Sequence, residues 1–387
     1  MYPGITADPA ADATLADAFT LSSRLLPDDD AAEFLVTLSR LPAALAGARL
    51  RLRLGPTTVM AISLPPESRD APLRFGPTRL PLWKLRRQRA FDVVVSSEGD
   101  APPLRCAVTR LSGELLEALT LPSPEAFFDR IQLHHRRYKD PRLLMLGAIS
   151  AYGRFADFEV RAAALTIPAH RLLERDFRRF DAHDLELMRW ICDQGLDLVD
   201  EGAGLLARTA SPKWTLVRWT VSLATVCGLL SICQDRLDHA TRFFGVAASQ
   251  TERVTISPVS ALNLVNACFI HGLLLAAEGG LEQARDSLER GVRAFPICAG
   301  AQNVMRNVWV LGDLLNVCKA SRSCFLALGR LGLLQPKSEP QMKATDSIDL
   351  GQIQSPLQAI LRAGRSPRLL AAVQDIAGRP LGPGIGG

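Results

Sequence analysis

The alternation of apolar and polar residues predicts several short β-strands in the first third of the chain. Residues 48–54 (ARLRLRL) alternate at every position, and the pattern resumes over residues 57–64 after a Gly-Pro pair. Residues 91–96 (FDVVVS) and 104–109 (LRCAVT) are rich in β-branched residues. Strands with one buried face show this period of two, whereas the Pro-rich residues 65–81 are typical of a loop.

The N-terminal residues predict a flexible segment followed by one helix. Residues 1–30 combine small residues, Pro and scattered Asp. Asp30 with Glu33 three residues later fits a helix capping box, and the apolar residues Phe34, Leu35, Leu38 and Leu41 follow it. Together with the strands, this helix makes residues 31–113 a small β or α/β module.

Helical spacing of apolar residues dominates the rest of the chain. Pro124 and Pro141 stand where helices are expected to begin, and Asp181 with Asp184 marks a third helix start. We therefore expect a mainly α fold in which the N-terminal module is followed by three further parts. These are a helical linker domain at 114–210, helical repeats at 211–335, and a tail with short helices and a flexible end at 336–387.

Two segments of the C-terminal half repeat with a spacing of 44 residues. Gly228 recurs as Gly272, and Ala240 recurs as Ala284. The large apolar residue that follows each Ala by four positions is Phe in the first segment and Leu in the second. Small residues let two helices of a hairpin approach closely, and large ones fill the space between neighbouring hairpins.

This pattern resembles the tetratricopeptide-repeat family. Residues 265–298 match it best, residues 221–254 match less well because Glu252 replaces the usual Pro, and residues 305–332 form a weak third unit. The resemblance implies stacked helical hairpins whose first helices line a concave groove. It places the following residues in that groove: Leu229, Ile232, Asn266, Phe269, Leu273, Arg306, Trp309 and Asp313.

A mostly apolar groove suits a helix or an extended segment of a protein partner. Trp309 and Arg306 are residue types that often anchor interfaces. The first hypothesis is therefore a scaffold or adaptor that binds a partner protein and can also associate with itself. The alternative is that the chain's own residues 356–377 fill the groove.

Other features favour a reduced, cytoplasmic setting. The N-terminus has no basic segment followed by an apolar core, so we expect no secretory signal. Residues 254–277 carry no charge but include Pro258 and Asn266, which favours a buried repeat helix over a membrane span. The eight Cys residues form no C-x-x-C pair, so we expect structural thiols and neither a metal nor another cofactor.

Two basic segments raise a second hypothesis. The net charge is +5, and Lys84, Arg86 and Arg87 in residues 79–89 lie beside a Trp, as Arg136 and Arg137 in residues 130–142 lie beside a Tyr. Cations interleaved with aromatic rings suit phosphate contact and base stacking. Nucleic-acid or anionic-surface binding is thus an alternative function, although solvated helix faces give the same pattern.

Signals for catalysis are weak. Residues 202–207 (GAGLLA) fit G-x-G-x-x-A, but a helical pattern precedes them, so we expect a turn between helices and no dinucleotide site. Asp181, His183 and Asp184 are expected to cap a helix rather than bind a metal. The sequence leans away from an enzyme. An enzyme or accessory subunit with an unrecognised site in the N-terminal half remains an alternative.

Overall fold

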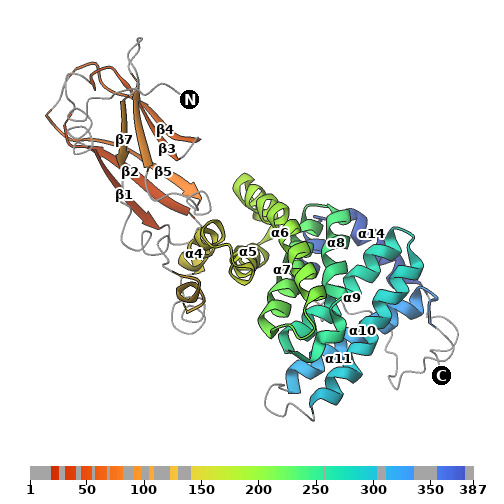
Figure 1. Ribbon diagram of the computed structural model, residues 1–387. Helices are drawn as coiled ribbons and strands as arrows, with labels where there is room; N and C mark the ends of the chain where they lie inside the picture. Colours follow the sequence, from red (N-terminus) through yellow and green to blue (C-terminus); the bar gives the residue numbers. More distant parts are fainter. Residues whose placement is uncertain are drawn as a thin grey trace, which may run out of the picture. The chain divides into compact units, whose positions relative to one another are not determined.

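The chain forms two compact units, Met1–Phe155 and Ala156–Gly387. The computed structural model describes residues 19–25, 31–40, 45–54, 57–67, 70–81, 91–96, 104–108, 123–129, 141–256, 258–302, 311–334 and 355–379. All of the described strands belong to the first unit, and the second is helical (Figure 1). The expected mainly α fold with a small N-terminal β module is therefore confirmed.

The described strands form two antiparallel sheets, with strand orders β1-β2-β5 and β4-β3-β6-β7. The edge strands of the two sheets lie near each other, with β4 near β5 and β1 near β7. Such contacts cover strand edges that would otherwise be open to pairing with other chains. The bounds are Phe19–Leu25 (β1), Ala31–Leu38 (β2), Arg49–Leu54 (β3), Thr57–Ser63 (β4), Leu73–Pro81 (β5), Phe91–Ser96 (β6) and Leu104–Val108 (β7).

Strand β2 replaces the helix that the sequence predicted after Asp30, and that prediction was wrong. Phe34, Val36 and Leu38 are buried, while the residues between them are partly exposed, which is the period of a strand. The strand pairs on both sides, with β1 and with β5. Tertiary pairing therefore outweighs the local capping signal.

The residue that was expected to close the capping box has a different role. Glu33 lies opposite Arg24 on β1 and opposite Arg79 on β5 in the strand register. Opposite charges placed across neighbouring strands favour pairing. Strand β1 itself lies within the segment 1–30 that the sequence predicted to be flexible.

Strand β5 lies within residues 65–81, which the sequence predicted to be a loop. Its register with β2 shifts between Phe34 and Val36, next to Gly76 and Pro77. Proline is tolerated there because β5 is the last strand of its sheet. Gly76 has a φ of +110°, and a Cβ at this position would lie 2.9 Å from the Phe34 carbonyl oxygen. The four strands that the sequence did predict are present as β3, β4, β6 and β7.

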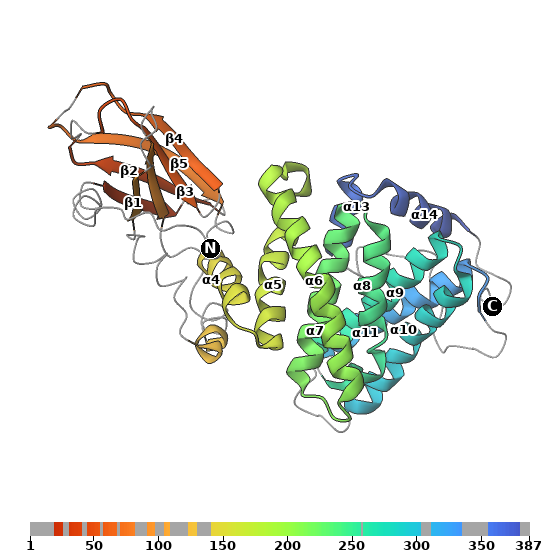
Figure 2. The same cartoon turned by 45° about the horizontal axis from the view of Figure 1, so that its top comes forward.

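The second unit is a stack of antiparallel helical hairpins (Figures 1 and 2). The first helices of the hairpins, α5, α7 and α9, pack side by side, and α11 continues this row against α9. The second helices, α6, α8 and α10, pack against their partners in each hairpin. The bounds are Phe158–Leu173 (α5), Ala182–Arg208 (α6), Trp214–Cys233 (α7), Leu237–Ala248 (α8), Pro258–Ala277 (α9), Leu281–Gln302 (α10) and Leu311–Arg330 (α11).

The described residues include further helices, among them the 3-10 helix Thr251–Ile256 and a helical segment at 124–129 after Pro124. Helix α4 (Pro141–Arg154) begins at Pro141, as the sequence predicted, and belongs to the first unit. Helices α13 (Ser355–Arg362) and α14 (Pro367–Gly378) follow the stack, and we call residues 355–379 the tail. A short 3-10 helix, Phe177–Arg179, lies in the connection between α5 and α6.

Close contacts inside two hairpins follow the 44-residue repeat. A Cβ on Gly228 would lie 2.6 Å from the Phe244 ring, and one on Gly272 would lie 2.5 Å from Leu288. The turns repeat as well, because Asp235 (φ 56°) and Gly279 (φ 84°) both adopt the left-handed conformation. The two hairpins therefore share both their closest helix contact and their turn.

The stack differs from the sequence prediction at its two ends. The weak third unit, residues 305–332, is not a hairpin, since α11 runs unbroken from Leu311 to Arg330. An additional hairpin, α5–α6, precedes the predicted ones. Residues 202–207, expected to form a turn, lie inside α6. Gly202 is needed there because a Cβ would lie 2.6 Å from the Phe158 ring and 2.7 Å from the Thr220 hydroxyl.

The start of α6 confirms the predicted cap. The Asp181 side chain accepts hydrogen bonds from the backbone N–H groups of His183 and Asp184, and the Asp184 side chain accepts one from the N–H of Asp181. This reciprocal pair satisfies N–H groups that have no partner within the helix. These carboxylates thus serve the helix terminus.

The most apolar helices of the stack are also the most enclosed. Among the described residues, α7 is long and apolar enough to cross a membrane, but 83% of its most apolar window is buried inside the structure. Such burial is typical of a core helix. Six cysteines with described side chains are free thiols, and all of them except Cys318 are buried.

Candidate functional site: the row face and the tail

The predicted groove residues on α7 and α9 are all buried. Leu229, Ile232, Asn266, Phe269 and Leu273 are each at most 3% exposed. We call the surface of α7 and α9 on which they lie the row face. Of the other predicted residues, Arg306, Trp309, Lys84, Arg86, Arg87, Arg136 and Arg137 lie outside the described residues, and Asp313 lies on α11 with its side chain outside them.

The row face is separate from the surfaces that close the hairpins. On α9, Gly272 points to α10 and His271 points to α8, where it lies against Gly245. An α-helix turns by about 100° per residue, so Asn266 is rotated by roughly 120° from Gly272 and by roughly 140° from His271. The row face is therefore not the surface that binds the second helices.

The chain's own tail lies against this row. Helix α13 packs on α7, and α14 packs on α9 and α11. Figure 2 shows both tail helices, in dark blue, at the upper end of the stack. Leu369, Val373 and Ile376 form the buried stripe of α14, whereas Arg368 and Gln374 are exposed. The alternative in which residues 356–377 fill the groove stays a prediction, because α11 also packs on α9 and α5 packs on α7, and these helices enclose the same row.

Arg365, in the turn between α13 and α14, binds the connection between α5 and α6. Its Nε donates a hydrogen bond to the Phe177 carbonyl oxygen at 3.0 Å, and its guanidinium lies 5.7 Å from the centre of the Phe180 ring. Arg365 also acts on Cys233 at the end of α7. Burial raises the pKa of that thiol to about 11, and the charge of Arg365 opposes the rise.

Ser366 binds the next connection, between α7 and α8. Its hydroxyl donates a hydrogen bond to Asp235 Oδ1 at 2.8 Å, and Ser366 is fully buried. Asp235 is the residue with the left-handed backbone in that turn. Two adjacent tail residues, Arg365 and Ser366, thus contact the turns of two successive hairpins. We call this pair the Arg-Ser anchor.

One polar group of the row face has no hydrogen-bond partner among the residues that the structure describes. The Asn266 side-chain oxygen is buried and accepts no hydrogen bond from the described residues. An unsatisfied buried acceptor costs about 1–3 kcal/mol.

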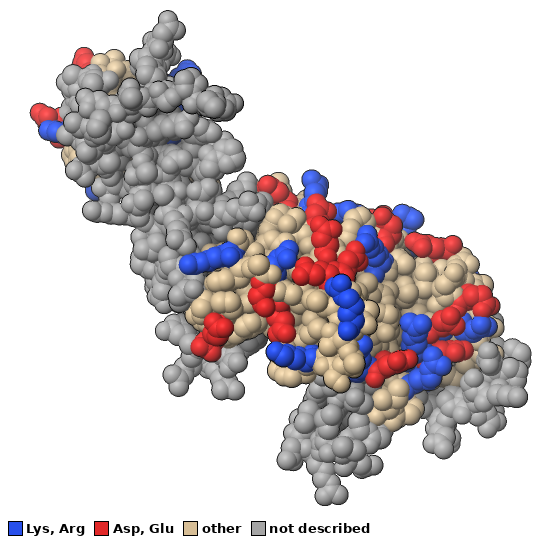
Figure 3. Space-filling model, viewed as in Figure 1, with Lys and Arg blue, Asp and Glu red and all other residues tan. Residues whose placement is uncertain are grey.

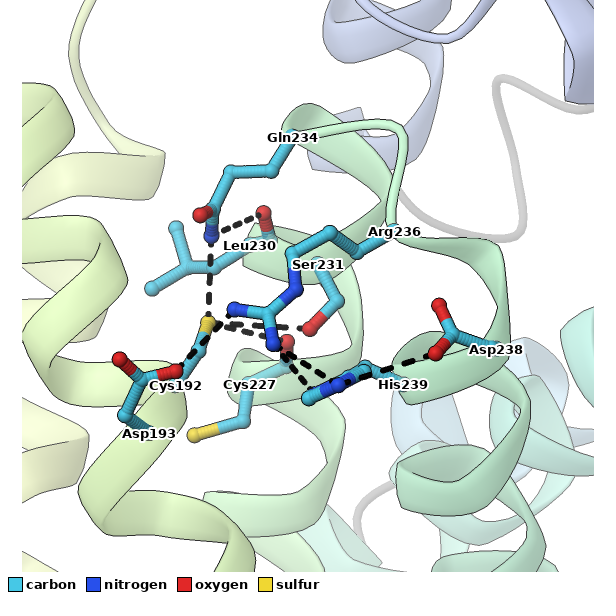
Figure 4. A network of polar contacts seen from close by, with 9 residues as sticks. All are labelled: Cys192, Asp193, Cys227, Leu230, Ser231, Gln234, Arg236, Asp238 and His239. Carbon is cyan, nitrogen blue, oxygen red and sulfur yellow. Dashed lines mark hydrogen bonds and ion pairs between the residues drawn. The ribbon is translucent and has the colours of Figure 1, made fainter.

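A second polar cluster joins α6, α7 and α8 (Figure 4). The Cys192 sulfur receives hydrogen bonds from Gln234 Nε2 at 3.4 Å and from the Ser231 hydroxyl at 3.7 Å. Burial raises the pKa of the Cys192 thiol to about 11 despite these contacts. The thiol is therefore neutral at physiological pH, and a neutral thiol is a poor nucleophile.

The charged half of this cluster is a structural clamp. Arg236 donates to Asp193 on α6 at 3.1 Å and lies 2.8 Å from His239 Nε2 on α8. His239 in turn lies 3.7 Å from the Asp238 carboxylate. Charged residues of α8 and of the turn before it thus hold His239. Cys192 is bound by a separate pair of residues, Ser231 and Gln234. The cluster fastens α6 to the next hairpin.

The visible surface of the helical unit carries both signs of charge interspersed (Figure 3). On that face, the described residues form no continuous basic area of the kind that binds nucleic acid. One aromatic and basic group was not predicted. Arg218 lies 5.5 Å from the centre of the Trp214 ring and 5.0 Å from that of Trp219, and Trp214 is 51% exposed.

The sequence did not predict the Arg-Ser anchor. The tail helices were visible as two apolar patterns, but nothing local indicates that Arg365 and Ser366 reach turns more than a hundred residues earlier. Within the described residues, no group of three or more His, Cys, Asp or Glu side chains is placed to hold a metal ion. Searches of protein families, curated proteins and solved structures find no match for this chain.

Proposed function

We propose that this protein is an adaptor that binds a helical segment of a partner protein on the row face of its helical stack. The observation that supports the proposal best is that an amphipathic helix, α14, lies against α9 and α11. A surface that accepts one amphipathic helix has the shape and apolar character to accept another. The repeat pattern resembling the tetratricopeptide family supports the same function.

The energetics of such a site favour apolar burial. A partner helix that replaces α14 would bury its own apolar stripe, and each side chain of the size of Leu369, Val373 or Ile376 buried there contributes about 1.5–3 kcal/mol. Binding of this kind is less sensitive to salt than binding through surface charges.

Site-specific photo-crosslinking in the native cells tests the proposal. A photoreactive residue replaces Ala277, which is exposed at the end of α9, in the full-length chain. The matched control replaces Asp286, which is exposed on α10. We expect a protein partner to crosslink at residue 277 and to remain bound at high salt. Crosslinks at residue 286 alone, or at neither residue, would show that the row face is not the binding surface.

A further inference from the structure

The tail helices are too short to be stable by themselves. Helix α13 has 8 residues and α14 has 12. Isolated helices below about 12–15 residues are marginal in water even with favourable sequences. Their helical state therefore depends on packing against α7, α9 and α11. Docking and folding of the tail are coupled.

The tail is also held by fewer contacts than the hairpins. Every residue from Leu264 to Ile270 of α9 is buried, whereas α14 buries only the stripe of Leu369, Val373 and Ile376. The side-chain hydrogen bonds of the Arg-Ser anchor end on the connections between helices and not on the helix interiors. Release of the tail consequently leaves the contacts of Gly228 and Gly272 inside the hairpins intact.

The contacts of the tail define what the site recognises. A cation is held by the Phe177 carbonyl oxygen and the Phe180 ring, and a hydroxyl is held by the Asp235 carboxylate. The helix that begins directly after the hydroxyl carries apolar residues at positions 369, 373 and 376, spaced four and three residues apart. The site thus recognises an Arg-Ser pair that is followed by a helix with one apolar stripe.

We propose that the tail is an internal ligand which a partner must displace, and that the partner segment is an amphipathic helix introduced by an Arg-Ser pair. This inference rests on the proposed function and specifies the partner class and its regulation. The tethered tail competes at a high effective concentration, so partners that lack the pair or the stripe are excluded. Displacement exposes the parts of α7, α9 and α11 that the tail covers, and it occurs only when a segment of matching chemistry is present.

Hydrogen exchange on the unmodified full-length protein is the first test, because it requires no substitution. Amides of α14 are expected to exchange at least tenfold faster than amides of α9, since the tail opens without the stack. Equal exchange rates in the two helices would show that the tail is an integral part of the core and would overturn the inference.

A peptide supplied in trans is the second test. The probe is a fluorescent peptide of residues 355–379, and its binding is measured by anisotropy. Leu369→Asp with Ile376→Asp in the full-length chain expels the native tail, because an unpaired carboxylate is costly in an apolar contact. The matched control, Arg368→Asp with Gln374→Asp, places two carboxylates on exposed positions of the same helix.

We expect the variant lacking its docked tail to bind the peptide at least tenfold more tightly than the wild type or the control. A peptide carrying Arg365→Ala and Ser366→Ala is expected to bind that variant at least tenfold more weakly. Equal binding by the variant and the wild type would overturn displacement, and equal binding of the two peptides would overturn the Arg-Ser specificity. These outcomes are independent of the crosslink at residue 277, whose absence would overturn the proposed function instead.

Discussion

Gly272 on α9 lies directly against Leu288 on α10, and a Cβ at residue 272 would come within 2.5 Å of the Leu288 Cγ. The same relationship joins Gly228 and Phe244, each 44 residues earlier. The distance between the two helices of a hairpin is thus set by the absence of a side chain at one position and the presence of a large one at the other.

Substitution of Gly272 is expected to separate α9 from α10. Gly272→Leu should lower the free energy of unfolding by about 1–3 kcal/mol or more, which is the range for overpacking in a close-packed interior. Chemical denaturation followed by circular dichroism measures the change. Gly228→Leu provides the parallel case, because Phe244 is as close. A wild-type midpoint in both variants would show that the close contacts do not set the hairpin geometry.

Two glycines of α6 should respond to alanine in opposite directions. Gly202→Ala brings a methyl group against the Phe158 ring and is expected to destabilise the unit. A methyl group at Gly204 meets only the end of Arg208, at 3.7 Å, so Gly204→Ala should stabilise α6 by up to about 1 kcal/mol through helix propensity alone. Thermal denaturation of the two variants shows whether the melting temperature falls for Gly202→Ala and rises for Gly204→Ala. Destabilisation by both substitutions would contradict the contact argument.

Features that depend on residues close together in the sequence were predicted, whereas features that depend on distant contacts were missed. Local periods predicted β3, β4, β6 and β7, and the small and large repeat positions predicted the contacts of Gly272 and Gly228. Strand β2 was missed because its pairing with β1 and β5 outweighs a capping signal at Asp30. Membership of the tetratricopeptide family stays a prediction.

The candidate site shows the same division. The repeat register placed Phe269 and Leu273 on one face of α9, but it could not show that α11 and α14, later in the chain, pack on that helix. The Ser366–Asp235 hydrogen bond joins residues that are distant in sequence and carry no local signal. Such contacts arise from the stack as a whole.

The turns of the two hairpins should tolerate substitution differently. Gly279 has a φ of +84° and no atom within 4 Å of a built Cβ, so Gly279→Ala introduces backbone strain without a clash and should cost about 1–2 kcal/mol. Asp235→Gly relieves the same strain but removes the acceptor of the buried Ser366 hydroxyl, and the two effects oppose each other. Denaturant titration should show a clear loss for Gly279→Ala and a smaller change for Asp235→Gly. The reverse order would show that the tail contact contributes more than the backbone strain.

His271 of α9 is positioned as a buried neutral imidazole. Its Nδ1 lies 3.1 Å from the Ser287 hydroxyl oxygen, and that hydroxyl donates to the Cys268 carbonyl oxygen. Since the Ser287 proton is used there, Nδ1 of His271 is the donor in their contact. Burial and the positive charge of Arg290 lower the pKa of His271 to about 4 from its ordinary 6.5.

This lowered pKa predicts a loss of stability in mild acid. Above pH 6.5 the imidazole is neutral in both states, and no effect arises. Below pH 6.5 the unfolded chain binds a proton that the folded chain does not bind until about pH 4. The free energy of unfolding should therefore fall by about 2 kcal/mol between pH 7.5 and pH 5 from this group alone.

His271→Asn should remove that part of the pH dependence, whatever its effect at neutral pH. His183→Asn is the matched control, because the His183 side chain is 46% exposed. Denaturant titrations at the two pH values compare the variants, and an unchanged pH dependence in His271→Asn would mean that the imidazole is already accessible to protons in the folded state.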